Sequence, residues 1–412
     1  MRVLTLTNLY PPHHYGGYEL ACRDVMERWA ERGHQVTVLT SNVRLAPESA
    51  EGHSEVTVER SLSISLAGSV LLEPKLRDRW RAEQKNHQIL DRALATVRPE
   101  VVSVWGMGAM STSLLTTLAR REVPIVYLVS DDWLTYAIKL DPWMRLWQHS
   151  RWLGRLAEPL LDVPARLVDV GRTGTFCFVS ASTRDRAAAG SPWTFPDCTI
   201  THLGVDTRDF PIVSSWPRKG WGWRLICPAR LDKRKGIATA IRAVSLLPEP
   251  AELTVCSAAD EPYRLELEAL VRSLGLSGRV SFEVVGRHEL ARLYREADLC
   301  LFPSEWSEPF GLVPLEAMAG GTPVVATGTG GSGEFLVDGV NCLRFPPEDH
   351  AALAKAVSHL AEEGELRSTL VANGAVTAAS LTADRLADSL EAWHLSASRH
   401  FAGGRPAPSV VG

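Results

Sequence analysis

Two carboxylates bracket the start of an expected helix: Glu308 precedes the turn and Glu316 lies inside it, with seven residues between them. The apolar run 299–302 is an expected strand, and Pro314 suits the first turn of the helix, where a missing N–H costs nothing. Free backbone amides near Leu312 would attract an anion, phosphate above all. An anion-binding helix start beside two acids suggests a ligand that has both phosphate and hydroxyl groups, as a nucleotide sugar has.

Two cations are expected at the same sheet edge as these acids. Arg230 and Lys235 follow the expected strand 224–228 and precede an expected helix. Because the carboxyl ends of parallel strands meet at one edge, both should emerge near the Glu308–Glu316 loop. Fixed positive charges there could neutralise a diphosphate and stabilise the charge that grows on it as a sugar bond breaks. The alternative interpretation is a solvated basic turn.

The first half of the chain adds two further candidate contacts, each after an expected strand. Gly16 and Gly17 could let the backbone approach a ligand, although a tight turn would need the same small residues. Asp131 and Asp132 follow the strand 125–129, where a ligand would lie, or else they cap the next helix. The glycine pair is not a G-x-G-x-x-G loop, so hydride chemistry has no support here.

Two alternating series of strands and helices must position these residues. In the first series we expect strands at 3–7, 35–40, 101–105, 125–129, 176–179 and 199–203. The second series is expected as strand 224–228, helix 236–247, strand 253–256, helix 263–274, strand 280–285, helix 289–297, strand 299–302, the helix near Leu312, strand 324–326 and helix 334–337. Alternation of this kind predicts doubly wound α/β domains that bind ligands at the carboxyl ends of their strands.

The domain bounds follow from this alternation and from the proline- and tryptophan-rich stretch 211–223, which we interpret as a linker. We expect two similarly built Rossmann-like domains with a cleft between them. A late helix without a strand partner should pack back on the first domain, and the tail should be flexible. The bounds are, in that order, 1–213, 214–381, 382–402 and 403–412.

Composition limits the class of protein. A chain of 412 residues favours two domains, and 45% hydrophobic residues let both bury a core. The net charge of −4 argues against a general nucleic-acid binder. Seven cysteines without a C-x-x-C pair predict reduced core residues. No spacing is typical of a metal site, and we expect neither a metal nor a cofactor.

The apolar runs favour a soluble, cytoplasmic protein. Pro11 and Pro12 interrupt the first run too early for a signal peptide, and no run reaches the roughly 18 residues of a membrane span. The stretch 143–161, rich in tryptophan and arginine, has two interpretations. One is a core-facing helix with arginine stems along apolar surface. The other is a surface that touches an acceptor or, peripherally, the inner face of the membrane.

Together these residues resemble glycosyltransferase family 4, the retaining enzymes of the GT-B fold. The stretch 308–316 is similar to that family's E-x7-E motif, and the match spans nearly the whole chain. The supporting segments, in the family's order, are Pro11-Pro…Gly16-Gly17…Glu19, Arg32-Gly-His34, Gly204-Val-Asp206 and Arg230-Leu…Lys235-Gly.

The resemblance implies that the first domain lies on the acceptor side and that the second binds the donor. It also implies a role for each candidate residue. Arg230 and Lys235 would grip the donor diphosphate. Glu316 would hold the ribose hydroxyls, and Glu308 would lie beside the donor sugar. The glycine pair of the first domain would close on the phosphates, and the base would lie near Arg287. The backbone amides that would meet the sugar and the β-phosphate belong to Phe310, Gly311, Leu312 and Val313.

One position departs from the family pattern. Members commonly place a histidine, near the C6 hydroxyl of the sugar, after the strand that here ends at Val129. This sequence has Ser130-Asp-Asp132 there, and we expect Asp131 or its neighbour to take that place. The alternative is that His13, His14 or no side chain supplies the contact.

The reaction that the resemblance implies is transfer of a hexosyl group from a nucleoside-diphosphate sugar to an acceptor hydroxyl, with retained anomeric configuration and no metal. Glycan, lipid-linked and natural-product acceptors are all compatible with it. Two rival functions are a sugar-nucleotide epimerase on the same fold and a sugar-nucleotide-binding protein that has lost catalysis. Donor hydrolysis without acceptor separates them, because slow nucleotide release marks a transferase and sugar isomerisation an epimerase.

Overall fold

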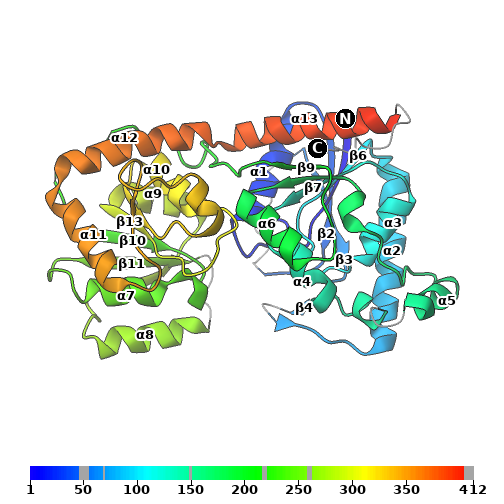
Figure 1. The fold of residues 1–412 in the computed structure, drawn as a ribbon, viewed down its shortest axis with the longest axis horizontal. Helices are drawn as coiled ribbons and strands as arrows, with labels where there is room; N and C mark the ends of the chain where they lie inside the picture. The colour runs from blue at the N-terminus through cyan, green and yellow to red at the C-terminus, as the bar shows by residue number, and fades with distance from the viewer. Residues whose placement is uncertain (46–54, 68–69, 148–150, 216–219, 258–261, 403–412) are drawn as a thin grey trace. The chain divides into compact units, whose positions relative to one another are not determined.

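The computed structural model describes residues 1–45, 55–67, 70–147, 151–215, 220–257 and 262–402 (Figure 1). The chain forms two compact units. The first comprises Met1–Thr201 and the chain from Ala387 onward, and the second comprises His202–Leu386. The expected flexible tail, 403–412, lies outside the described residues.

The boundary between the units comes earlier than the predicted boundary after residue 213. The segment that follows Thr201 packs on the second unit: the Val213 N–H donates to the Ala319 carbonyl at 2.7 Å. Asp209 pairs with Arg287 at 3.0 Å in the same unit. These contacts join residues far apart in sequence, so linker composition alone could not reveal them.

A seven-stranded parallel sheet forms the centre of the first unit, in the order β3-β2-β1-β6-β7-β8-β9. Its strands are β1 (Arg2–Leu6), β2 (Gln35–Ser41), β3 (Thr57–Leu62), β6 (Val101–Val104), β7 (Ile125–Val129), β8 (Thr175–Phe178) and β9 (Cys198–Ile200). A short antiparallel pair consists of β4 (Leu66–Ala67) and β5 (Val70–Leu71). The helices of this unit are α1 (Gly17–Glu31), α2 (Leu76–Val97), α3 (Ser113–Arg120), α4 (Trp133–Leu140), α5 (Arg151–Leu161) and α6 (Ala181–Gly190).

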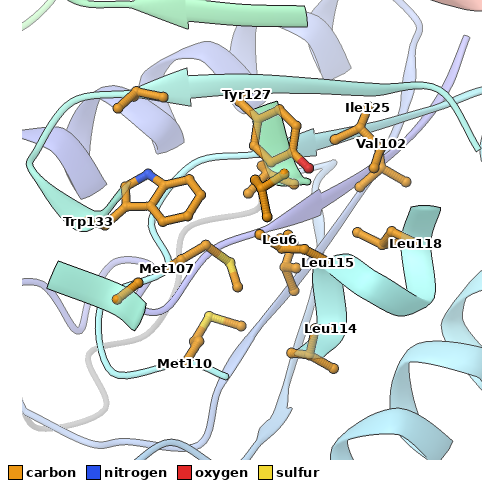
Figure 2. Packing of buried hydrophobic residues seen from close by; sticks show 14 of the residues in the cluster. Leu6, Val102, Met107, Met110, Leu114, Leu115, Leu118, Ile125, Tyr127 and Trp133 are labelled. Atoms are coloured by element: carbon orange, nitrogen blue, oxygen red, sulfur yellow. The ribbon is translucent and has the colours of Figure 1, made fainter. Parts of the chain in front are cut away.

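Apolar runs in these strands are buried on both faces, as expected for a parallel sheet covered by helices. Every residue of β6, β7 and β8 is buried. Figure 2 shows part of this core, in which strand residues meet side chains of α3 and the residues around it. The labelled members are Leu6, Val102, Met107, Met110, Leu114, Leu115, Leu118, Ile125, Tyr127 and Trp133.

A six-stranded parallel sheet forms the centre of the second unit, in the order β12-β11-β10-β13-β14-β15. Its strands are β10 (Arg224–Pro228), β11 (Glu252–Ser257), β12 (Val280–Val284), β13 (Leu299–Phe302), β14 (Val324–Ala326) and β15 (Leu343–Arg344). Its helices are α7 (Ile237–Val244), α8 (Tyr263–Ser273), α9 (Arg287–Glu296), α10 (Leu312–Ala319), α11 (His350–Glu362) and α12 (Gly364–Ser380). The doubly wound architecture predicted from the alternation is therefore present in both units.

Two helix predictions need correction. The expected helix 334–337 does not form: the 3-10 helix η4 (Gly330–Glu334) ends at Glu334, and the Val337 N–H donates to Asn341 Oδ1 at 2.8 Å instead of continuing a helix. The core-facing interpretation of 143–161 holds for Trp143, which is buried, but not for α5. Leu160 of α5 is 84% exposed. Helical periodicity identified an apolar side of this stretch but could not say what that side contacts.

The last helix, α13 (Ala383–Ala402), packs on the first unit, as predicted. The buried indole of Trp29 donates its Nε1–H to the Ala387 carbonyl at 3.1 Å. Glu391 receives hydrogen bonds from Arg32 at 2.6 Å and from the His34 ring at 2.7 Å. Across the described ranges, no helix is long and apolar enough to cross a bilayer.

Candidate active site

The strand order of each sheet marks one edge position for a ligand. In the second unit, β11 and β12 lie on one side of β10, and β13 to β15 lie on the other. Loops that leave the carboxyl ends of the two strands at such a reversal diverge and leave room between them. These loops are 229–236 after β10 and 303–311 after β13, which contain Arg230, Lys235 and Glu308. In the first unit the corresponding reversal lies between β1 and β6.

Lys235 and Glu308 meet at this edge of the second unit. The Lys235 Nζ lies 2.6 Å from Glu308 Oε1, and the side chains are only 17% and 4% exposed. The same carboxylate oxygen accepts a hydrogen bond from the Ser304 hydroxyl at 2.6 Å. Its backbone is held as well, because the Gly331 N–H donates to the Glu308 carbonyl at 2.7 Å. A cation and a carboxylate are thus fixed side by side in a partly dehydrated position.

Close backbone packing explains why the two loops stay together. Gly236 has a φ of +67°, and a Cβ added to it would lie 1.9 Å from the Pro303 carbonyl oxygen. Only glycine fits that approach. The indole of Trp306 adds a second contact, with the Arg234 guanidinium 4.6 Å and the Lys235 ammonium 5.4 Å from its ring centre.

Helix α10 begins at Leu312, as its glycine and proline signals predicted. Gly311 precedes it with a φ of +99°, a backbone conformation that residues with a side chain rarely adopt. Phe310 is buried, its ring 5.0 Å from that of Phe335 and 5.3 Å from that of His202. Its side chain therefore serves the core, and only its backbone could contact a ligand. Leu312 and Val313 are half-buried at the helix start.

Glu316 is oriented by a tyrosine from α9. The buried Tyr294 hydroxyl donates to Glu316 Oε2 at 3.0 Å and lies 3.4 Å from the Val313 carbonyl oxygen. Burial, and secondarily the nearby Glu316 carboxylate, raise the pKa of Tyr294 well above its ordinary value, so it remains a hydrogen-bond donor. The sequence offered no signal for this pair, because the partners lie 22 positions apart on different helices.

The two predicted arginines differ in their surroundings. Arg230 is half-buried and lies near Asp232, whose pKa falls to about 2, mainly through the hydrogen bond from Arg234. Arg287 is only 14% exposed and pairs with Asp209, with its guanidinium 5.5 Å from the Phe210 ring centre. The Arg287 side chain is therefore engaged with residues just after the unit boundary, which leaves its backbone as the part that could contact a base.

The corresponding edge of the first unit gathers hydroxyl and amide groups. The Tyr18 hydroxyl donates to Asn8 Oδ1 at 2.6 Å, and the Asn8 amide donates to the Gly108 carbonyl at 3.2 Å. A Cβ on Gly106 would lie 1.3 Å from the Tyr18 hydroxyl, so a larger residue there would displace the Tyr18 side chain. Tyr136 also approaches, with its hydroxyl 3.1 Å from where a Gly108 Cβ would stand.

Asp131 joins this group from the end of β7. Its carboxylate accepts hydrogen bonds from the Tyr136 hydroxyl at 2.7 Å and the Trp133 N–H at 3.2 Å. Burial raises its pKa to about 6, and these two hydrogen bonds oppose the shift. Asp132 instead pairs with Arg186 at 2.9 Å. The capping interpretation and the site interpretation of Asp131 are both compatible with this geometry.

Gly16 and Gly17 form the start of α1. Gly16 has an extended backbone, and its N–H donates to Glu19 Oε2 at 3.1 Å, which satisfies one backbone donor at the start of the helix. A Cβ on Gly16 would make only an ordinary contact, so folding does not require glycine there. His13, a proposed substitute for the family histidine, is buried and accepts a hydrogen bond from the Leu45 N–H.

Several side chains at these edges were not predicted from the sequence: Asn8, Tyr18, Tyr136, Tyr294, Ser304 and Trp306. Asn8 and Ser304 come within two residues of a strand end, so their positions alone could have signalled them. The tyrosines lie within helices, where nothing in the local pattern separates them from core residues.

Comparison with known proteins shows that both halves of the chain are similar to one class of enzyme. Residues 15–209 match the family described as Glycosyltransferase Family 4, and residues 214–377 match the family described as glycosyl transferases group 1. An uncharacterised glycosyltransferase of Methanocaldococcus jannaschii is 25% identical over 398 residues, covering 90% of this chain and 92% of the relative.

Solved structures share the fold. Sucrose-phosphate synthase from Thermosynechococcus elongatus aligns with a TM-score of 0.74 at 21% identity, covering 98% of this chain and all of that one. HepE from Anabaena, in complex with UDP and glucose, aligns with a TM-score of 0.69 at 19% identity, covering 96% and 99% of the two chains. The architecture of both units is therefore the GT-B fold predicted from the sequence.

Proposed function

We propose that this chain, which belongs to the glycosyltransferases of family 4, transfers a hexosyl group from a nucleoside-diphosphate sugar to an acceptor hydroxyl. The observation that carries the proposal is the pairing of Lys235 with Glu308 at the edge where β10 and β13 end. The start of α10 lies in the same loop region, and it can accept an anionic group. A cation for phosphate and an acid for sugar hydroxyls thus stand next to each other.

The proposed reaction retains the anomeric configuration. The bond from the anomeric carbon to the diphosphate oxygen breaks, and the acceptor oxygen bonds to that carbon from the same face. The departing phosphate takes the proton of the acceptor hydroxyl, so no side-chain nucleophile is needed. Lys235 and Arg230 would face the growing negative charge, where a fixed cation has its largest effect on rate.

The Lys235–Glu308 pair suggests how donor binding prepares the site. The donor diphosphate would compete with Glu308 for the Lys235 ammonium, because phosphate offers several acceptor oxygens. Once the diphosphate binds Lys235, the Glu308 carboxylate would separate from the ammonium and could accept a sugar hydroxyl. Ser304 would continue to orient this carboxylate. Glu316, held by Tyr294, would accept the ribose hydroxyls.

The first unit would supply groups for the sugar or the acceptor. Asp131 and Tyr136 form a hydrogen-bonded pair after β7, and Asp131 would take the place of the family histidine. The amide of Asn8 and the glycines of α1 lie at related positions of this unit. We further propose that the reaction needs neither a metal nor a cofactor, since Arg230 and Lys235 supply positive charge. The epimerase and the inactive binding protein are not favoured by the family matches.

Nucleotide release without acceptor tests the proposal. HepE is recorded with UDP-glucose, so UDP-glucose heads a panel of nucleotide sugars screened by thermal shift. With the donor that stabilises the chain most, Lys235→Ala should lower nucleotide release roughly 100-fold or more. Lys233→Ala is the matched control, because Lys233 lies in the same turn, is 70% exposed and pairs with Glu266. Equal rates for the two variants, or sugar isomerisation, would contradict the proposal.

A further inference from the structure

Helix α5 exposes a row of large apolar side chains. Trp152, Leu156 and Leu160 recur at every fourth position, which places them along one side of the helix. Their exposed fractions are 64%, 64% and 84%, and Leu153 beside them is 42% exposed. We call these four residues the α5 stripe. Single exposed apolar residues are common on proteins, but a continuous row of them marks an interaction surface.

Polar contacts fix α5 so that the stripe stays outward. The Glu158 carboxylate receives hydrogen bonds from Arg120 at 3.0 Å and from Arg166 at 2.7 Å. The Ala165 N–H donates to the same group at 2.9 Å. Gly154 lies against the chain on that side, since a Cβ there would be 2.5 Å from the Ala165 carbonyl oxygen. Rotating the helix to bury the stripe would break these contacts.

The sequence stretch that contains the stripe is basic. The stretch 143–161 contains three arginines and one acid, and that acid is Glu158, which two further arginines already neutralise. Arg155 is exposed on α5 itself, whereas Arg145 pairs with Glu73. The next acid, Asp162, comes only after the last residue of the helix. An apolar row with the exposed Arg155 beside it is complementary to a lipid bilayer, whose interior is apolar and whose headgroups can be anionic.

The dimensions of α5 restrict how it could meet such a surface. Its 11 residues span about 16 Å, far less than a bilayer core, so the helix can only lie in the plane of the interface. Figure 1 places it at the periphery of the first unit, beyond α2 and α3. Tryptophan is favoured at the boundary between headgroups and acyl chains, and Trp152 begins the stripe.

We propose that the α5 stripe inserts into the interface of a lipid bilayer that carries anionic headgroups. The side chains of Trp152, Leu156 and Leu160 enter the acyl region, and Arg155 contacts the lipid phosphates. This surface belongs to the first unit and shares no residue with the donor site at β10 and β13. It would hold the chain where an acceptor hydroxyl on a membrane lipid is available.

Vesicle co-sedimentation of the full chain tests the proposal. Wild type should bind phosphatidylcholine vesicles that contain phosphatidylglycerol and bind pure phosphatidylcholine more weakly. The double variant Leu156→Ser/Leu160→Ser should lose roughly tenfold or more of its partition into the anionic vesicles, because two apolar side chains no longer insert. Arg155→Glu should weaken binding to the anionic vesicles only.

The matched control replaces exposed apolar residues of the second unit. Leu265→Ser/Val376→Ser changes side chains that are 72% and 69% exposed, and it should bind anionic vesicles as wild type does. Absence of wild-type binding, or equal binding by the α5 and control variants, would overturn the proposal. So would light scattering that shows a dimer in wild type and a monomer in the α5 variant, since a second copy would then cover the stripe.

Donor chemistry separates this proposal from the proposed function. Leu156→Ser/Leu160→Ser should release nucleotide from the donor at the wild-type rate in the absence of vesicles, which also shows that it folds. Lys235→Ala should lose nucleotide release and keep vesicle binding. Loss of both properties in either variant would contradict the separation of the two surfaces.

Discussion

At the edge where β10 and β13 end, the second unit brings a partly buried ion pair and an oriented carboxylate together. At the corresponding edge of the first unit, after β1 and β6, hydroxyl and amide groups meet one acid of raised pKa. Both sheets reverse their strand order at these edges, so the same topology carries two kinds of chemistry. The position of each site follows from the fold. We propose that the loop residues suit the edge of the second unit to phosphate and the edge of the first unit to neutral hydroxyls.

We expect the largest effect from a substitution at the edge of the second unit where Lys235 pairs with Glu308, which we call the charged edge. Glu308→Gln keeps the shape of the side chain but removes the charge that holds Lys235, and we expect kcat to fall roughly 100-fold or more. Glu305→Gln is the control, because Glu305 lies in the same loop and accepts a hydrogen bond from Thr239. Initial rates at saturating donor measure both variants. If Glu308→Gln and Glu305→Gln had similar rates, the charged edge would have no special role.

The second prediction compares how the loops pack at the two edges. In Gly236→Ala the added Cβ would collide with the Pro303 backbone, and alanine would have to adopt a positive φ. We expect the free energy of unfolding to fall by roughly 3 kcal/mol. Gly106→Ala meets mainly the side chain of Tyr18. The double variant Gly106→Ala/Tyr18→Ala should therefore lose less stability than the sum of the two single variants. Denaturant unfolding measures each variant, with Gly275→Ala as the control for φ alone, since its Cβ would meet nothing.

The third prediction concerns the edge of the first unit, where Asp131 meets hydroxyl and amide groups, and it is tested by varying the pH. The Asp131 pKa of about 6 in the folded protein exceeds the ordinary value of 3.8. Ionisation of the carboxyl group therefore opposes folding, and the free energy of unfolding should fall as the pH rises from about 4 to about 6. If the carboxylate accepts a ligand hydroxyl, kcat/KM should fall below about pH 6. Tyr136→Phe removes a hydrogen bond to the charged form and should shift that limb upward. Asp131→Asn should abolish the limb, whereas Asp132→Asn should leave it in place.

The smallest expected effect concerns Glu316. Tyr294→Phe removes only the hydroxyl that orients this carboxylate, which corresponds to about 1 kcal/mol. We expect KM for the donor to rise several-fold while kcat changes little. Glu316→Gln should raise KM further, because the acceptor for the ribose hydroxyls is itself weakened. A change in kcat without a change in KM would place Glu316 with the reacting sugar instead of the nucleotide.

Local signals made much of the second unit predictable. The strand 224–228 and the start of α10 at Leu312 match their predictions because apolar runs, Gly311 and Pro314 act within a few residues. The place of Lys235 and Glu308 at one edge of the sheet was predictable for the same reason: each follows a strand that is easy to recognise. Their direct contact was not predicted, since it depends on a loop approach that only Gly236 permits.

Other features depend on contacts that no local pattern encodes. Helix α5 has the amphipathic periodicity that normally indicates a core-facing helix, yet Glu158 and its arginine partners turn the apolar side outward. The hydroxyls of Tyr294 and Tyr18 reach partners on other elements. The helices α11 and α12 were not among the predicted elements. The roles of the individual site residues stay predictions until variants are measured.

The packing of α13 on the first unit determines when that unit can complete its folding during synthesis. Trp29 lies near the start of the chain, yet its indole is covered by Ala387 and by His394, 4.7 Å away between ring centres. A ribosome makes these partners only after nearly the whole protein has emerged. The first unit must therefore keep an apolar surface uncovered during translation of the second, a period in which it is open to aggregation or chaperone binding.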